Sequence, residues 1–424
     1  MNTQTTDTLK SSDVRIFERI ETECRAYCRD LPVVFEKGSG SYAISTDGTR
    51  YLDFFSGAGA LNYGHNHPKM IEAAMNYIAE GNILHGLDMF TTAKRELLEE
   101  IERTLLTPKN WDYKIQFTGP TGTDANEAAL KLARLVTSRR EIVAFRGSYH
   151  GMSIGSLSVS GSRKLRQAGE PLLNEVTFVP YEFGPNGKFD SIEYLNQHFG
   201  DSSGGNELPA AVIVEGVQIQ AGVYAASSEW LRQLQKWTKA NGVLLIVDEV
   251  QTGCGRTGEF FSFENSGIVP DIITVAKSIG GLGLPMAMVF LRRGIDAWKP
   301  GEHTGTFRGN QLAFVAGRVA LQFWRDEAFL QLVNDNAETF ASAMESMSSS
   351  TQILETRYKG LIGGIDFGVG ETAKAQEFQR RAQEEHIIVE RCGREGEVVK
   401  LMPPINTPND VLIQGLEKLS RLIG

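Results

Sequence analysis

The stretch LLIVDEVQTGCGRTG, residues 244–258, starts as an apolar strand and continues into two acidic residues and a series of glycines. Four large apolar residues come first, and Asp248 and Glu249 follow them directly. A carboxylate at the end of a buried strand is costly in free energy unless a positive group meets it. The fold and the chemistry therefore depend on which cation the chain brings to this position.

Five further apolar runs of the same kind alternate with helical patterns along the chain. Strands that are apolar on both faces and separated by helices predict a mostly parallel sheet covered by helices. We therefore expect an α/β fold whose ligand lies beyond the carboxyl ends of the strands. The five runs are KIQFTG (114–119), EIVAFRG (141–147), AAVIVEG (210–216), IITVAK (272–277) and MAMVFL (286–291).

The two ends of the chain carry different patterns. Residues 13–30 have the apolar spacing of one amphipathic helix, and an Asp47-Gly48 turn predicts a hairpin. A long helix is expected from about residue 326, followed by mixed helix and strand. We expect a large α/β domain and a smaller α+β domain built from both chain ends, with the boundaries 1–62, 63–325 and 326–424.

Composition excludes several classes of protein. The 424 residues are 41% hydrophobic and 22% charged, which is ordinary for a globular protein of more than one core. A net charge of −9 without a basic block argues against a nucleic-acid partner. Four cysteines in so long a chain fit a reducing compartment. Because residues 1–12 are polar and no apolar run reaches about 18 residues, we expect a cytoplasmic protein that does not enter a membrane.

Cys24 and Cys28 lie one helical turn apart within the expected N-terminal helix. Two thiols on one helical face can bind a metal, but no second cysteine pair or histidine stands near them in the sequence. We therefore favour a buried helix face for both cysteines and expect no metal site.

A turn of small residues follows the first strand, in FTGPTGTDANEAALKLAR at 117–134. The backbone N–H groups of Thr121, Gly122 and Thr123, together with the dipole of the helix behind them, can hold a phosphate. The stretch lacks the lysine of a Walker loop and the glycine spacing of a dinucleotide-binding loop. The competing interpretation is an ordinary turn and helix N-cap.

Two further strand ends carry unusual side chains. GSYHG places Tyr149 in a loop bounded by glycines, where its ring either stacks on a flat ligand or packs on its own domain. Lys277 ends a buried run in VAKSIGGLGLP. Because a buried lysine has a lowered pKa, it suits Schiff-base chemistry, and an ion pair with Asp248 is the alternative.

Taken together, these features agree on one cofactor. Pyridoxal 5'-phosphate needs a phosphate cradle, a ring to stack on, a lysine that forms an imine and an acid that keeps its pyridine nitrogen protonated. The pyridinium nitrogen is then the cation that Asp248 requires. We predict pyridoxal 5'-phosphate as the cofactor, with Lys277 and Asp248 as catalytic residues.

The chain also resembles the class III, fold-type I pyridoxal-phosphate aminotransferases over nearly its whole length. The motifs that carry the resemblance are GTDANEAALKLAR, YHG, VDEVQTGCGRTG, VAKSIGG and GTFRGN, in the order and spacing of the family. The resemblance implies that Lys277 is the imine lysine and proton shuttle and that Asp248 holds the pyridine nitrogen. It also implies that Val250 packs on the ring face opposite Tyr149 and that Gln251 lies near the phenolic oxygen.

The resemblance extends to assembly and substrates. Thr306 in GTFRGN is implied to reach the phosphate of the neighbouring subunit, so a homodimer with shared active sites is expected. Within the family, LDMFTTAKRELLE, FTGPTGTDAN and PGEHTGTFRGNQLAF, with Arg308, are most similar to diaminobutyrate–2-oxoglutarate aminotransferases. The implied reaction is that glutamate aminates aspartate 4-semialdehyde, as in the first committed step toward ectoine.

One pair of positions departs from the family. Ile219 and Gln220 in EGVQIQAGV replace a small residue and a glutamate, and Lys400 in VVKLMPPI stands where the family has an arginine. That glutamate and arginine pair in the family, and the arginine binds the α-carboxylate of glutamate. The expected substrate residues are Gln220, Arg308 and Lys400, with looser donor discrimination because a lysine replaces an arginine. The alternative is that Gln220 only hydrogen-bonds within its loop and Lys400 is solvated.

Other functions compete with this one. A different amino donor or an omega-amino substrate stays open within the family, and a lyase or aminomutase uses the same fold and cofactor. A non-catalytic binding protein is a different class, against which the presence of Lys277 and Asp248 argues. A nicotinamide dehydrogenase would need a glycine fingerprint after a strand, and the sequence has none.

Overall fold

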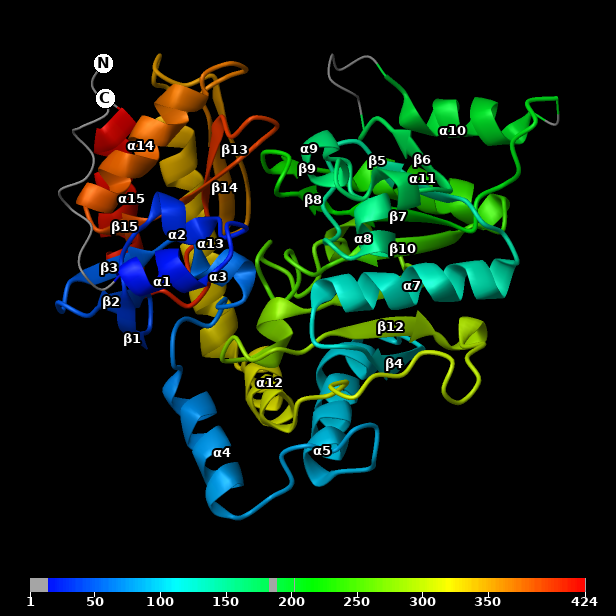
Figure 1. The fold of residues 1–424 in the computed structure, drawn as a ribbon, viewed down its shortest axis with the longest axis horizontal. Helices are drawn as coiled ribbons and strands as arrows, with labels where there is room; N and C mark the ends of the chain where they lie inside the picture. Colours follow the sequence, from blue (N-terminus) through cyan, green and yellow to red (C-terminus); the bar gives the residue numbers. More distant parts are fainter. Residues whose placement is uncertain (1–13, 183–188, 202, 424) are drawn as a thin grey trace.

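The structure, a computed structural model, describes residues 14–182, 189–201 and 203–423 and divides into two lobes (Figure 1). One lobe holds a seven-stranded sheet with its helices, and the other holds elements from both ends of the chain. The tail expected at residues 1–12 lies outside the described residues. In the described ranges, no helix is long and apolar enough to span a membrane, and no group of three or more His, Cys, Asp or Glu side chains is arranged to hold a metal ion.

The large sheet has the strand order β4-β12-β11-β10-β7-β5-β6. All six predicted apolar runs are confirmed as strands of this sheet, and the pairs from β11 to β6 are parallel. β12 is antiparallel to both neighbours, because the connection from β11 contains the short 3-10 helix η5 (Lys277–Gly280) and no crossover helix. The strands are β4 (Tyr113–Phe117), β5 (Ile142–Phe145), β6 (Val176–Val179), β7 (Ala211–Glu215), β10 (Leu244–Asp248), β11 (Ile272–Val275) and β12 (Met288–Arg292).

β6 is a strand of this sheet that the apolar pattern does not predict. It lies at the edge, where it pairs only with β5, and three of its four residues are half-buried. An edge strand covered on one side needs no continuous apolar run, so the signal that identifies the other strands is missing here.

Alternate residues of the central strands pack into separate cores on the two faces of the sheet. Leu245 belongs to the core that contains residues of α11 (Ser228–Ala240), whereas Ile246 belongs to the core that contains residues of α7 (Gly122–Thr137). Both side chains are almost completely buried. Because helices cover both faces, these strands are apolar throughout, which is why the sequence predicts them.

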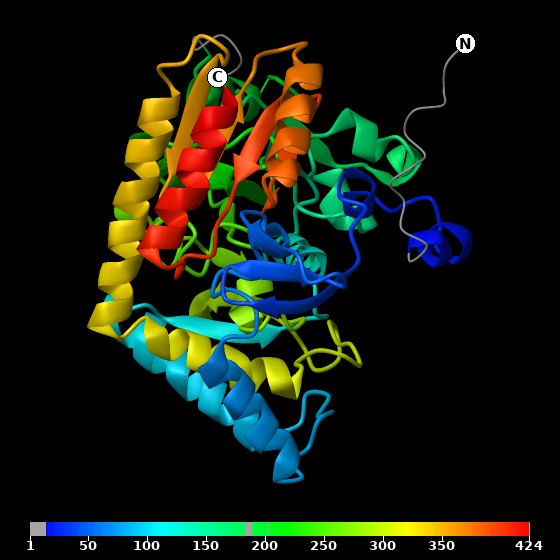
Figure 2. The ribbon, with the colours of Figure 1, turned by 90° about the vertical axis from the view of Figure 1, so that its left-hand side faces the viewer.

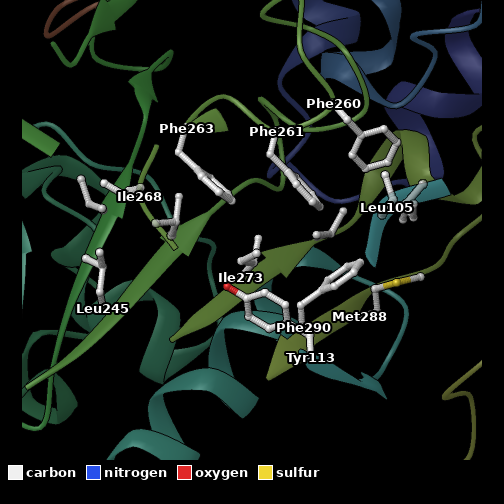
Figure 3. Close-up of a cluster of buried hydrophobic side chains, with 14 of the residues drawn as sticks. Leu105, Tyr113, Leu245, Phe260, Phe261, Phe263, Ile268, Ile273, Met288 and Phe290 are labelled. Carbon is white, nitrogen blue, oxygen red and sulfur yellow. The ribbon is translucent and has the colours of Figure 1, made fainter. Parts of the chain in front are cut away.

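Figure 3 shows part of the core that contains Leu245 and residues of α11, where it packs against the loop after β10. Phe261 stacks on Phe263 with an interplanar angle of 7°, and its ring meets Phe290 of β12 edge-on at 5.6 Å between centroids. Aromatic pairs of this kind add about 0.5–1.5 kcal/mol beyond the burial of their area. The glycine-rich stretch 250–258 is therefore held between β10 and a buried aromatic cluster.

The second lobe joins the two ends of the chain. β15 (Ile387–Ile388) pairs in parallel with β3 (Arg50–Asp53), and one apolar core contains both Phe54 and Leu416. The Asp47-Gly48 hairpin is confirmed between β2 and β3, and the long helix expected from about residue 326 is confirmed as α13. The domain boundaries stay a prediction. The other elements of this lobe are β1 (Phe35–Ser39), β2 (Tyr42–Ser45), α13 (Glu327–Met347), β13 (Glu355–Lys359), β14 (Ile362–Asp366), α14 (Thr372–Glu384), β16 (Glu390–Cys392), β17 (Val398–Leu401) and α15 (Asn409–Ile423).

Shorter elements connect the strands and the lobes. α4 and the connection that leads to α5 project from the body of the molecule (Figure 1, Figure 2), and apolar side chains along this connection are exposed. The connecting elements are α3 (Ser56–Gly59), α4 (Pro68–Ala79), α5 (Thr92–Ile101), η2 (Glu102–Leu106), α6 (Thr107–Lys109), α8 (Ile154–Ser158), α9 (Arg163–Arg166), η3 (Glu170–Leu172), α10 (Ser191–Gly200), β8 (Val217–Gln218), β9 (Tyr224–Ala225), η4 (Glu264–Ser266), η6 (Arg293–Ile295) and α12 (Gln311–Phe323).

The prediction for the N-terminal segment is wrong in two respects. The segment forms two short helices, α1 (Arg15–Ile20) and α2 (Tyr27–Asp30), because the backbone becomes extended at the residue after α1. No residue of either helix is buried, and Cys24 and Cys28 are both exposed. Helical periodicity shows that one side of a segment is apolar. Whether that side is buried depends on whether another part of the chain packs against it.

Candidate active site

The carboxyl ends of the strands bring the predicted cofactor residues to one edge of the large sheet. Asp248 is the last residue of β10, and Lys277 follows the adjacent parallel strand β11 after a single residue. The loop with Tyr149 follows β5, and α7 starts shortly after β4. This edge is where open α/β sheets bind ligands, because the loops there are free to diverge.

Three donors from three parts of the chain hold the carboxylate of Asp248. Its Oδ2 meets Nδ1 of His150 at 2.7 Å and accepts from Nδ2 of Asn126 at 2.8 Å. Its Oδ1 accepts from the backbone N–H of Val250 at 2.9 Å. A carboxylate has about four acceptor positions, so one position on Oδ1 is left for a further donor.

The first turn of α7 contains the predicted phosphate cradle, but the backbone N–H of Thr121 is already bonded there to Oδ2 of Asp124 at 3.2 Å. Thr121 caps the helix in a capping box with Asp124, which satisfies two backbone N–H groups at this terminus. Among the described residues, the N–H groups of Gly122 and Thr123 meet no acceptor, as expected for the start of a helix. A side chain at position 122 would collide with Val250, since an added Cβ would lie 2.5 Å from Val250 Cγ1. The free N–H groups and Val250 therefore border the same space.

Lys277 combines backbone strain, burial and a weak hydrogen-bond partner. Its φ is +57°, a left-handed conformation that costs a non-glycine residue on the order of 1–3 kcal/mol and is found mostly at functional sites. Its Nζ donates to the carbonyl of Ala58 at 2.8 Å, and Nε2 of Gln251 donates to the same carbonyl at 2.9 Å. Burial, assisted by the charge of Lys400, lowers the pKa of Lys277 to about 8. The neutral amine is therefore far more populated near neutral pH than in an ordinary exposed lysine.

Tyr149 is half-buried beside a second strand end. Its backbone N–H donates at 3.1 Å to Oε2 of Glu215, the last residue of β7. Burial raises the pKa of Glu215 well above its usual value, and the adjacent charge of Asp248 raises it further. The two neighbouring acids therefore differ: Asp248 is held by three donors, whereas burial shifts Glu215 toward its neutral form.

The three predicted substrate residues do not form one cluster within the chain. Gln220 lies in the loop after β8, where its carbonyl accepts from the N–H of Gly393 at 3.0 Å. Lys400 is fully buried on β17, and its Nζ approaches Oε2 of Glu390 on β16 to 2.7 Å. The alternative of a solvated Lys400 is therefore wrong, because the strand register turns its side chain inward.

Arg308 and Thr306 lie in a different place, in the loop before α12. Arg308 donates from Nη1 to the carbonyl of His303 at 3.1 Å, within the same loop, and Thr306 is exposed. The ring of Phe307, also exposed, contacts His85 at 5.6 Å between centroids. The loop therefore packs against the projecting connection between α4 and α5.

Sequence reasoning missed several residues that the structure places at the site. His150 and Asn126 stand inside the motifs YHG and GTDANEAALKLAR and hold Asp248, so the motifs contained a usable signal. Glu215 ends its apolar run as Asp248 does, which is the same signal at a second strand. Ala58 and Glu390 had no local signal, because their roles depend on chain segments far away in the sequence.

The residues present fit pyridoxal 5'-phosphate. The unpaired N–H groups of Gly122 and Thr123 suit a phosphate, and the remaining acceptor position on Asp248 suits one ring N–H. Lys277, held only by a carbonyl oxygen, is free to leave that bond for an aldehyde carbon. The chain therefore provides a partner for the phosphate, the nitrogen and the aldehyde of this cofactor.

Comparison with known proteins agrees with this geometry. The family model described as Aminotransferase class-III matches residues 26–423. A diaminobutyrate–2-oxoglutarate transaminase of Bordetella parapertussis is 46% identical over 410 residues, which cover 96% of this chain and 94% of the relative. A protein of the same name from Wolinella succinogenes is 45% identical over 413 residues, with 97% and 96% covered. The crystal structure of an S-selective transaminase from Bacillus megaterium has a TM-score of 0.85 and 26% identity, and the match covers 97% of both chains.

Proposed function

The chain belongs to the class-III aminotransferase family, and we propose that it catalyses the amino transfer between L-glutamate and L-aspartate 4-semialdehyde that yields L-2,4-diaminobutyrate and 2-oxoglutarate. The enzyme is a transaminase that uses pyridoxal 5'-phosphate. The observation that supports the activity is the convergence of Lys277, Asp248 and the unpaired N–H groups of α7 at one sheet edge. The names of relatives about 45% identical over nearly the whole chain support the choice of substrates.

Different residues would bind the different parts of the cofactor. Gly122 and Thr123 would bind the phosphate through their free N–H groups, with Thr121 capping the helix beside them, and Asp248 would bind the pyridine nitrogen. Tyr149 and Val250 would lie on the two faces of the ring, with Gln251 beside the phenolic oxygen. When bound, the cofactor withdraws electrons from the carbon that carries the amino group.

Lys277 is the residue that moves the proton. Its pKa of about 8 lets it take up and release a proton at neutral pH, and its only hydrogen bond is to a carbonyl. His150 and Asn126 keep Asp248 in place, so that its carboxylate stays oriented while the proton moves.

A survey of the first half-reaction tests the proposed substrates. The cofactor-loaded protein is mixed separately with glutamate, 2,4-diaminobutyrate, alanine and 4-aminobutyrate, and the change in cofactor absorbance is followed in a single turnover. We expect glutamate and 2,4-diaminobutyrate to react fastest. Faster reaction with alanine or 4-aminobutyrate would replace the proposed substrates, and no reaction with any amine would reject the transaminase assignment.

We also propose a homodimer in which Thr306 serves the phosphate site of the other subunit. The loop of Thr306 packs on the connection between α4 and α5, where Ile83, Leu84 and Phe90 are exposed, Phe90 completely. Contiguous exposed apolar side chains of this kind mark protein–protein contacts in soluble proteins. A second copy covering this surface would bring Thr306 to its site.

Mixed dimers test this arrangement. Chains with Lys277→Ala and chains with Thr306→Ala are each of low activity, but their hybrid contains one site with an intact lysine and an intact partner threonine. We expect mixing to restore part of the turnover, whereas mixing Lys277→Ala chains with each other restores none. A fully active monomer in sedimentation experiments would overturn the proposal.

We place the enzyme in the cytoplasm, in the route that supplies 2,4-diaminobutyrate for ectoine. The four cysteines are unpaired, in agreement with a reducing compartment. Deletion of the gene in the source organism should lower ectoine accumulation at high salt, and supplied 2,4-diaminobutyrate should restore it. Unchanged ectoine in the deletion strain would separate this enzyme from that route.

A further inference from the structure

The ion pair between Glu390 and Lys400 differs from an ordinary buried salt bridge. Lys400 is fully buried and the side chain of Glu390 is 15% exposed, and their charged atoms are 2.7 Å apart. Within the described part of the chain, neither Lys400 Nζ nor Glu390 Oε2 has a hydrogen-bond partner of acceptable geometry. Burying charged atoms that lack hydrogen bonds costs free energy. Such a pair therefore suggests a further partner, for example a ligand.

A comparison with another ion pair of the same sheet makes this clear. Arg357 on β13 pairs with Asp366 on β14 at 2.7 Å, and it also donates to the carbonyl of Gly222 at 2.7 Å. Asp366 in turn accepts from the N–H of Gly368. The charged groups of Arg357 and Asp366 are therefore hydrogen-bonded to their surroundings. We call the pair of Glu390 and Lys400 the open pair, because its charged atoms lack such hydrogen bonds to the described residues.

The backbone around the open pair is bonded to the segment 54–58, which also holds Lys277. The strand end two residues beyond Lys400 is tied to Ser56, whose Oγ donates to the carbonyl of Met402 at 2.6 Å. Ser56 belongs to the same short helix, α3, as Ala58, whose carbonyl accepts from Lys277. On the other side of this segment, Phe54 donates to the carbonyl of Ile388, two residues before Glu390.

Electrostatics places the pair within reach of both Tyr149 and Lys277. The charge of Lys400 contributes, after burial, to the lowered pKa of Lys277. The charge of Glu390 contributes, again after burial, to the raised pKa of Tyr149. The charges of the pair are therefore close enough to influence Lys277 and Tyr149.

We propose that Glu390 and Lys400 recognise the amino acid head group of 2,4-diaminobutyrate, with Glu390 binding the 2-ammonium group and Lys400 the carboxylate. This inference rests on the proposed function. When the 4-amino group reacts near Lys277, the 2-amino and carboxylate groups lie at the other end of the molecule. An adjacent cation and anion match this zwitterion, and charge-assisted hydrogen bonds to it replace those that the pair lacks.

Two simpler amines isolate the two contacts. 4-Aminobutyrate is 2,4-diaminobutyrate without the 2-amino group, and 1,3-diaminopropane is 2,4-diaminobutyrate without the carboxylate. We expect Glu390→Gln to lower the preference for 2,4-diaminobutyrate over 4-aminobutyrate on the order of tenfold in kcat/KM of the half-reaction. Lys400→Met should instead lower the preference over 1,3-diaminopropane. The crossed pattern assigns each charge to one group of the substrate.

Controls separate recognition from folding and from catalysis. Glu385→Gln and Lys418→Met alter an exposed pair with a 3.5 Å separation and should change neither preference. Because a single change leaves one buried charge alone, Glu390→Gln/Lys400→Met removes both charges and should fold stably while losing both preferences. Calorimetric binding of the three amines to Lys277→Ala protein, with and without each substitution, gives the same ratios without turnover.

The outcomes are distinct. Preferences unchanged in both single variants and in the double variant would overturn the proposed recognition and leave a structural ion pair. A parent enzyme that reacts with glutamate but not with 2,4-diaminobutyrate would overturn the proposed function, and this inference with it. A parent that does not prefer 2,4-diaminobutyrate over the two simpler amines would overturn the inference alone.

Discussion

Two carboxylates, the buried Asp248 at the end of β10 and the partly exposed Glu390 on β16, each meet a basic side chain at 2.7 Å, yet they differ in their other contacts. Asp248 has three donors, from His150, Asn126 and the backbone. Among the described residues, Oε2 of Glu390 has the ammonium group of Lys400 as its neighbour, without a well-formed hydrogen bond. A carboxylate held by three donors keeps a fixed orientation, whereas a carboxylate beside a single ammonium group can also bind a ligand. The Asp248 region should therefore matter equally for every substrate, and the Glu390 region should matter only for some.

The largest effect is expected at Lys277. Lys277→Ala removes the amine to which we assign cofactor binding and proton transfer, so the protein should fold, hold the cofactor weakly and transfer no amino group from any substrate. Lys359→Ala is the matched control, because Lys359 is also a half-buried lysine that donates to a carbonyl, that of Ser262. Near-normal turnover of Lys277→Ala with even one amine would remove the strand-end region from the mechanism.

Asp248→Asn should come next in size. An amide cannot stabilise a protonated pyridine nitrogen, so we expect a loss on the order of 10²-fold or more in single-turnover rate, roughly 2.7 kcal/mol. The loss should be the same factor for 2,4-diaminobutyrate, 4-aminobutyrate and glutamate. Glu249→Gln, at the adjacent residue that bonds Ser262 and Thr252, is the control. A loss that varies between substrates would contradict the division of roles between the two carboxylates.

A smaller effect is expected at His150, which acts through Asp248. His150→Leu removes one donor and should lower kcat on the order of tenfold with little change in KM, since an incompletely held carboxylate is less well oriented. His150→Asn places an amide N–H near the position of Nδ1 and should recover part of the rate. Equal rates for the two variants would mean that the hydrogen bond to Asp248 at 2.7 Å has no part in catalysis.

The smallest effect links the two regions through charge. The pKa of Lys277 is lowered to about 8 by burial and then by the charge of Lys400, so Lys400→Met should raise it. Uptake of pyridoxal 5'-phosphate by the cofactor-free protein needs the neutral amine, so its rate should rise with pH through a midpoint near 8. In Lys400→Met this midpoint should move to higher pH, as stopped-flow absorbance measures. An unmoved midpoint would show that the two regions are electrostatically independent.

The strands and the cofactor residues were predictable from the sequence for a physical reason. Buried strands covered on both faces are apolar throughout, and their carboxyl ends meet at one edge, so a residue such as Lys277 is placed by its position after a strand. Capping of α7 by Thr121 is likewise local, because it involves residues within one turn. The six apolar runs, and the positions of Asp248 and Lys277 at their ends, could therefore be predicted from local sequence patterns alone.

Contacts between distant segments were decided by the tertiary structure alone. Lys400 faces Glu390 because β16 and β17 pair in an antiparallel register that aligns these two residues, and a shift of one position would turn both side chains to the other face. The exposure of Cys24 and of Phe90 depends on which surfaces this chain offers to an apolar side chain. Local periodicity determines which residues form a strand or a helix face, but register and packing partners are set by the whole fold. The sequence by itself therefore determined six of the seven strands of the large sheet and the positions of Asp248 and Lys277 at strand ends, and the structure decided which distant side chains, such as Glu390 and Lys400, face each other.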